Sequence, residues 1–173
     1  MFLNKIKVFL FISISLIFFF LTYNDVKSQE IKIVEGKAIV VDGDTIKINN
    51  VKIRFSGIDA PESYYKGKEQ FCLKGEEKIS CGKLSKVFLI EKIGNEKVKC
   101  EIEDKTDRYK RKLGECYVKD KSLSRILVKN GYAFDYPRYS KKKYSTEQEY
   151  AKKNSLGVWS MKFEFPWDFR KKN

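Results

Sequence analysis

Nine residues, RFSGIDAPE from Arg54 to Glu62, place a guanidinium and two carboxylates on one predicted strand and the turn that follows it. Carboxylate oxygens bind hard cations such as Ca²⁺. A carboxylate within hydrogen-bond distance of a water can also act as a general base. The planar fork of Arg pairs with phosphate oxygens. Taken alone, the segment is equally compatible with a polar turn.

Two other segments add residues of the same types. VVDGDTIKI contains Asp42 and Asp44, and TDRYKRKL contains Arg111. Asp and Gly are common in hairpin turns, so DGD alone would indicate only a turn. A further Asp at the end of a later strand, next to Glu62 and Arg54, favours a site that binds a cation.

The chain has no histidine. This absence excludes serine hydrolases, His-dependent phosphodiesterases and His-ligated metal nucleases, which need imidazole as a base or ligand. Hydrolysis by this chain would therefore depend on carboxylates, arginines and an oxygen-binding metal.

The order, spacing and residue types of these segments resemble the staphylococcal nuclease, or thermonuclease, family. The resemblance covers residues 31–170 and extends to LVKNGYAFDYPRYS and SLGVWS. It implies an α+β protein built on a five-stranded OB-fold β-barrel with about three α-helices. It also implies Ca²⁺-dependent hydrolysis of DNA and RNA to 3′-phosphate ends, with no obligate protein partner.

The resemblance assigns metal-binding and catalytic roles. Asp44 and Asp59 match the acids that bind one Ca²⁺ ion, and the Ala60 carbonyl matches a main-chain ligand where the family often has Thr. Asp42 lies next to the ion and tunes it. Glu62 matches the Glu that activates or orients the attacking water. Its alternative role is to cap a helix or turn after Pro61.

The same comparison identifies residues that contact the substrate. Arg54 and Arg111 match the two catalytic arginines, and the substrate-binding residues are Arg108, Tyr109, Tyr136 and Tyr139. For the last two tyrosines, core packing is the alternative. Lys110 departs from the family pattern, which usually has Gly before the second arginine. If that position requires positive φ, Lys is strained there.

Apolar periodicity predicts the elements that position these residues. Alternation over residues 31–41, 45–48 and 51–55 indicates three antiparallel strands, and strand character returns over 97–103 and 112–118. Leu84, Val87 and Phe88 have helical spacing within 80–93, and further helices are predicted over 122–129 and 145–154. In the aromatic and basic tail, Pro166 opposes the continuation of a helix.

The chain carries a formal net charge of +13. Residues 1–28 contain three Lys and one Asp, so 11 of these net charges lie beyond them. Such a charge attracts polyanions, including nucleic acid, anionic lipid and acidic glycans. The run Lys141-Lys142-Lys143 is either a solvated face or a phosphate contact.

Residues 1–28 resemble a secretory signal peptide, with a basic start, an apolar run and small residues near Ser28. The alternative is an uncleaved membrane anchor, and membrane contact is expected only in that case. Both place the domain at 29–173 outside the cytoplasm, as a secreted, periplasmic or cell-surface protein. The first rival to a nuclease is a non-catalytic OB module that binds nucleic acid at the cell surface, and the second is a membrane-surface protein.

The four cysteines lie in the predicted domain, and an oxidising compartment favours disulfides. Three pairings are possible; we favour Cys72 with Cys81 and Cys100 with Cys116. A zinc site made of the four thiolates is the alternative, although the close Cys-x-x-Cys spacing typical of such sites is missing.

Overall fold

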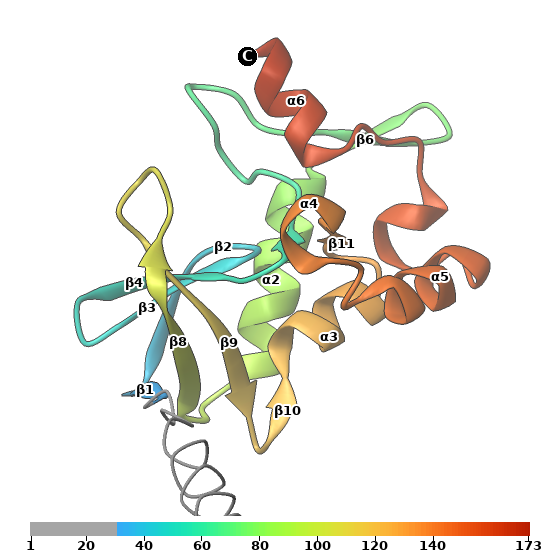
Figure 1. Cartoon of the computed structure of the whole chain (residues 1–173). Helices are drawn as coiled ribbons and strands as arrows, with labels where there is room; N and C mark the ends of the chain where they lie inside the picture. Colours follow the sequence, from blue (N-terminus) through green and yellow to red (C-terminus); the bar gives the residue numbers. More distant parts are fainter. Residues whose placement is uncertain (1–30) are drawn as a thin grey trace, which may run out of the picture. The chain divides into compact units, whose positions relative to one another are not determined.

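Strands β1 (Lys32–Gly36) and β2 (Ala38–Asp42) begin the part of the chain that the computed structural model describes, residues 31–173 (Figure 1). The predicted signal peptide or anchor lies outside the described residues. Only Lys37 separates the two strands. β1 pairs with β8 (Val98–Thr106), whereas β2 pairs with β3 (Thr45–Ile48), both antiparallel. The two edge strands of the sheet are therefore consecutive in the chain, which curls the sheet into a barrel.

The strand order is β1-β8-β9-β4-β3-β2. When β1 and β2 are counted as one bent strand, the barrel has the five strands that the sequence predicted, and the OB-type α+β fold is confirmed. A short strand, β10 (Lys121–Ser122), adds to β9 (Lys112–Val118). The pair of β4 (Val51–Phe55) with β9 is parallel, which decides how the site is assembled.

The three predicted helices are present as α2 (Cys81–Ile93), α3 (Leu123–Lys129) and α5 (Ser145–Lys153). The prediction of which face of α2 is buried was wrong in part, because the Val87 side chain is 50% exposed. The buried side of α2 instead repeats every fourth residue: Cys81, Ser85, Leu89 and Ile93. Leu89 and Ile93 join the barrel core, together with Leu123 and Leu127 of α3.

Two helices were not predicted: α4 (Pro137–Ser140) and α6 (Pro166–Lys172). Pro166 was expected to oppose the continuation of a helix, and it occupies the first turn of the new helix α6. The fixed φ of Pro suits that position, and its missing N–H would have no helical acceptor there. The basic end of the chain is thus an ordered helix (Figure 1).

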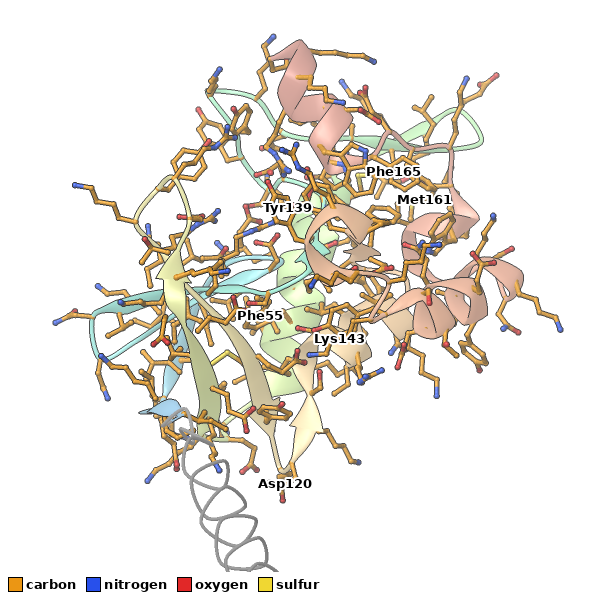
Figure 2. All side chains as sticks on the ribbon, viewed as in Figure 1. Phe55, Asp120, Tyr139, Lys143, Met161 and Phe165 are labelled. Atoms are coloured by element: carbon orange, nitrogen blue, oxygen red, sulfur yellow. A yellow bond between two sulfur atoms is a disulfide. The ribbon has the colours of Figure 1, made fainter. Side chains whose placement is uncertain are left out.

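A second, aromatic cluster lies beneath α6. The buried Phe134, from β11 (Phe134–Asp135), contacts Phe163 and Phe165, each at 5.0 Å between ring centroids. β11 pairs with β5 (Ile58–Asp59). Met161 and Phe165, labelled in Figure 2, pack against the same cluster. The short 3₁₀ helix η1 (Gly157–Ser160) contributes Val158.

Both favoured disulfides are present. Cys72–Cys81 joins the hairpin of β6 (Cys72–Lys74) and β7 (Glu77–Ile79) to the start of α2. Cys100–Cys116 links directly opposed residues of β8 and β9. All four sulfurs are bonded, so the zinc alternative does not apply. Among residues 31–173, no helix combines the length and apolarity needed to cross a bilayer.

Candidate active site

The parallel pair of β4 and β9 brings Arg54 and Arg111 to one end of the barrel. Arg54 lies opposite Leu113, and Arg111 directly precedes β9. Arg111 Nη1 donates to Thr45 Oγ1 at 3.1 Å. Thr45 in turn lies opposite Arg54 in the pair of β3 and β4. Two arginines that are distant in sequence are therefore both neighbours of Thr45.

Asp44, in the hairpin between β2 and β3, is bonded to this arrangement. Its Oδ1 accepts from Thr45 Oγ1 at 2.8 Å, and its Oδ2 accepts from Arg54 Nη1 and from the Ala60 N–H at 3.2 Å. The hairpin between β2 and β3 can approach Ala60 because Gly43 has no side chain. A Cβ on Gly43 would lie 2.9 Å from the Cβ of Ala60. Burial opposes ionisation of Asp44, but Arg54 and Thr45 hold its pKa below the usual value.

Asp59 is fully buried and accepts from two guanidinium groups. Arg54 Nη2 donates to its Oδ1 at 2.6 Å. Arg170 donates to both oxygens, from Nη1 to Oδ1 at 3.0 Å and from Nη2 to Oδ2 at 2.6 Å. Asp44 and Asp59 are thus joined through the single guanidinium of Arg54.

Glu62 lies on the other side of Arg170, whose Nη1 also donates to Glu62 Oε1. The Glu62 N–H donates to the buried Gln70 Oε1 at 3.0 Å, which fixes the backbone. Burial raises the pKa of Glu62 to about 7, the negative charge of Asp44 adds to the increase, and Arg170 opposes it. Two side chains therefore hold Glu62 in place: Gln70 bonds its backbone, and Arg170 bonds its carboxylate.

Asp42 lies next to Asp44 and faces the backbone after Glu62. Its Oδ1 accepts from the N–H groups of Gly43 at 2.8 Å and Ser63 at 3.2 Å. Burial, followed by the charge of Asp44, raises the pKa of Asp42. In the structure, Asp42 thus orders the loop that carries Glu62.

The loop before β9 positions Arg111 through Asp107. Asp107 Oδ2 accepts from Arg111 Nε at 2.7 Å, and its Oδ1 accepts from the Arg111 N–H at 3.0 Å. Lys110 has a φ of 61°, the left-handed conformation expected from the Gly of the family motif. Arg111 still points towards Thr45, so Lys110 does not displace it.

The predicted substrate-binding residues differ in accessibility. Tyr109 is 54% exposed, and its ring lies 4.9 Å from the guanidinium carbon of Arg108. Tyr139, which belongs to α4, is 63% exposed and is labelled in Figure 2. Tyr136 stacks on Trp167 at 4.9 Å and meets the edge of Tyr139 at 4.8 Å. One face of Tyr136 is therefore already covered by protein.

The acids of the site offer the oxygen ligands that Ca²⁺ prefers. A carboxylate has about four acceptor positions. Hydrogen bonds among the described residues occupy three of them on Asp44 and three on Asp59. One position on Asp44 Oδ1 and one on Asp59 Oδ2 are left for a cation, so the donor set fits Ca²⁺.

This site would not be a closed metal cage. Within residues 31–173, no three acidic or Cys side chains form a ready metal cluster. The guanidinium of Arg54 lies between Asp44 and Asp59, and that of Arg170 lies between Asp59 and Glu62. Waters and a substrate phosphate would have to complete the coordination.

Sequence reasoning missed four residues that the structure adds to the site: Thr45, Gln70, Asp107 and Arg170. Thr45 and Asp107 lie inside the recognised segments, and their polar side chains were the available signal. Gln70 and Arg170 belong to no motif, and only tertiary structure shows where they lie.

The family model for staphylococcal nuclease homologues matches residues 52–161. These residues include Arg54, Asp59, Glu62 and Arg111, whereas Asp44 lies before them and Arg170 after them. The match covers more than half of the chain.

Similar curated proteins have a wide range of lengths. The succinoglycan biosynthesis protein ExoI of Rhizobium meliloti (strain 1021) is 35% identical over 128 residues, which are 72% of this chain and 63% of that protein. The probable staphylococcal-like nuclease CAN2 of Oryza sativa subsp. japonica is 29% identical over 78% of this chain and 33% of its own length. Endonuclease YhcR of Bacillus subtilis (strain 168) is 32% identical over 76% of this chain and 12% of its own length. The matches thus span less than two thirds of each relative, and together with the family match they show that the chain belongs to the staphylococcal nuclease homologue family.

Proposed function

We propose that this protein is an exported, Ca²⁺-dependent nuclease that hydrolyses phosphodiester bonds of DNA and RNA and leaves 3′-phosphate ends. One observation carries the proposal: seven side chains form an unbroken series of hydrogen bonds and ion pairs. In order, they are Arg111, Thr45, Asp44, Arg54, Asp59, Arg170 and Glu62. Membership of the family and the names of its nuclease relatives support this reading.

In this mechanism, Asp44 and Asp59 would hold the cation, with the Ala60 carbonyl as a further ligand. A bound Ca²⁺ would neutralise charge that develops on the phosphate oxygens. Glu62 accepts a proton from the attacking water or fixes its orientation. The water oxygen bonds to phosphorus, and the bond from phosphorus to O5′ breaks. The departing oxygen takes a proton from solvent water, which leaves a 5′-hydroxyl and a 3′-phosphate.

Arg54 and Arg111 are already oriented by acids, and both keep donors for a phosphate. An Arg side chain has five N–H donors. Arg54 uses three, on Asp44, Asp59 and the Ile58 carbonyl. Arg111 also uses three, on Asp107 and Thr45. The two remaining donors on each can stabilise negative charge in the transition state without any rearrangement of the side chain.

Substrate capture draws on the net positive charge and on exposed rings. Beyond residue 28 the net charge of +11 attracts a polyanion over long distances. Tyr139 can stack on a base without regard to sequence. Arg108 and Tyr109 lie together on the loop that positions Arg111, where they can hold a terminal phosphate.

The rival function is binding of nucleic acid by an inactive OB-type module at the cell surface. An inactive module has no need for Glu62 or for two arginines fixed next to two buried acids. The complete set is present and connected, which favours catalysis. Export is proposed from the signal-like residues 1–28, which lie outside the described part of the chain.

Glu62→Gln tests the catalytic role directly. The variant should lower turnover by on the order of 10²- to 10⁴-fold, because an amide cannot accept the proton of the water. Affinity for single-stranded DNA, measured by fluorescence anisotropy in Ca²⁺, should stay within about threefold of wild type. Equal losses of turnover and affinity would assign Glu62 to binding, and unchanged turnover would remove it from the chemistry.

A further inference from the structure

Arg170, near the end of the chain, makes three hydrogen bonds to two acids of the proposed site. Two of them are parallel bonds to Asp59, and the third reaches Glu62 Oε1. Among the described residues, Arg170 is the only cationic side chain that pairs with Glu62. We propose that Arg170 is a positioning residue, which holds the Glu62 carboxylate in a fixed place relative to Asp59. This inference rests on the proposed function.

The helix that carries Arg170 is firmly anchored. Trp167, one turn earlier on α6, stacks on Phe165 at 4.5 Å and on Tyr136 at 4.9 Å. Phe165 contacts the fully buried Phe134. Because aromatic contacts of this kind contribute beyond the area they bury, α6 is part of the folded body. A helix held in this way suits a positioning role better than that of a movable plug.

The segment before α6 is also tied to the backbone of Glu62. Gln70 is buried, and its side-chain amide links the backbone of Glu62 to the backbone of Glu164. Its Oε1 accepts from the Glu62 N–H, and its Nε2 donates to the Glu164 carbonyl at 2.7 Å. The main chains of Leu73 and Lys162 also pair, at 2.9 Å in both directions. Gln70, which is bonded to Glu164, thus fixes the backbone of Glu62, and Arg170 fixes its carboxylate.

The bidentate bond to Asp59 makes Arg170 a specific support. A planar guanidinium can contact both oxygens of Asp59 and still reach Glu62, whereas an ammonium offers a single point of charge. Without Arg170, Asp59 would keep Arg54, but Glu62 would have no charged partner in the described part of the chain to hold its carboxylate. The expected consequence is a mobile Glu62 in a protein that still folds.

The test compares Arg170→Gln with Lys171→Gln in the full chain. Both remove one positive charge from α6, but Lys171 is exposed and, among residues 31–173, pairs only with Asp168. At saturating Ca²⁺, Arg170→Gln should lower kcat on the order of 10- to 100-fold, the loss expected when a catalytic group is misplaced. KM should stay within about threefold of wild type, and Lys171→Gln should resemble wild type. If kcat is unchanged or higher in Arg170→Gln, Arg170 is not a positioning residue, and a rise would show that it blocks the site.

A double-mutant cycle shows whether Arg170 acts through Glu62. In the Glu62→Gln background, Arg170→Gln should cause little further loss of kcat, since the group that it positions is already gone. Full additivity of the two losses would overturn the proposal.

A measurement independent of activity separates this inference from the proposed function. Amide hydrogen exchange over residues 59–63 should be faster in Arg170→Gln than in wild type or Lys171→Gln. Unchanged exchange would contradict positioning even in an active enzyme. A wild-type protein without metal-dependent cleavage would refute the proposed function, and the exchange result would still decide whether Arg170 fixes this loop.

Discussion

Gly82 and Glu62 lie in direct backbone contact, since a Cβ on Gly82 would be 2.0 Å from the Glu62 carbonyl oxygen. The first turn of α2 therefore packs against the loop that carries the proposed base. No side chain fits between them, which makes Gly82 a structural requirement of the site.

Gly82→Ala should lower both stability and turnover. At an open helix position the change from Gly to Ala stabilises by about 1 kcal/mol. Here the clash involves backbone atoms, so we expect a destabilisation of about 1–3 kcal/mol and a displaced Glu62. Urea unfolding and nuclease assays measure the two effects, with Val87→Ala on the exposed side of α2 as control. A stabilised, fully active variant would show that the contact is not tight.

Gln70→Leu should destabilise the protein because it leaves the Glu62 N–H and the Glu164 carbonyl without their partner. An unsatisfied buried polar group costs about 1–3 kcal/mol. The matched variant Gln70→Glu keeps the acceptor for Glu62 and loses the donor for Glu164. If turnover depends on the link to Glu62, Gln70→Glu should retain more activity than Gln70→Leu. Equal activities in the two variants would speak against that link.

Lys110→Gly should keep or raise stability, because a non-Gly residue in the left-handed region is strained by about 1–2 kcal/mol. The greater freedom of Gly in the unfolded chain offsets part of the gain, by about 0.4–1 kcal/mol. Turnover should be retained, since Asp107 still orients Arg111. Lys142→Gly, also at positive φ but on another loop, is the control. A loss of more than about 1 kcal/mol at position 110 would mean that the Lys side chain itself stabilises the loop.

Tyr139→Ala should weaken substrate binding with little effect on folding, because the ring is 63% exposed. Loss of one stacked base costs about 1–3 kcal/mol, so KM for single-stranded DNA should rise severalfold or more. Tyr139→Phe should behave like wild type, since stacking needs only the ring. An unchanged KM in Tyr139→Ala would place the base elsewhere.

The sequence predicted the local part of the site better than its long-range part. Arg54, Asp59 and Glu62 share one strand and its turn, so the motif alone keeps them close. Arg111 joins them because β4 and β9 pair in parallel, which the sequence did not predict. Arg170 lies 108 positions from Glu62, and only the packing of α6 against the aromatic cluster brings it there.

The errors in predicting the fold have similar causes. The helix that begins at Pro166 was missed, because Pro was interpreted as opposing a continued helix although it also favours a first helical turn, and local sequence does not distinguish the two. The buried side of α2 includes Cys81 and Ser85, which carry little hydrophobic signal. Their burial follows from the disulfide to Cys72 and from the close approach of the Gly43 hairpin to α2.

End mapping of cleaved single-stranded DNA tests the central claim most directly. The purified protein is incubated with substrate in Ca²⁺, and in parallel with a chelator, and the product ends are identified by mass spectrometry. We predict 3′-phosphate and 5′-hydroxyl ends that form only in the presence of Ca²⁺. Intact DNA bound tightly under both conditions, or cleavage that persists in the chelator, would contradict the account.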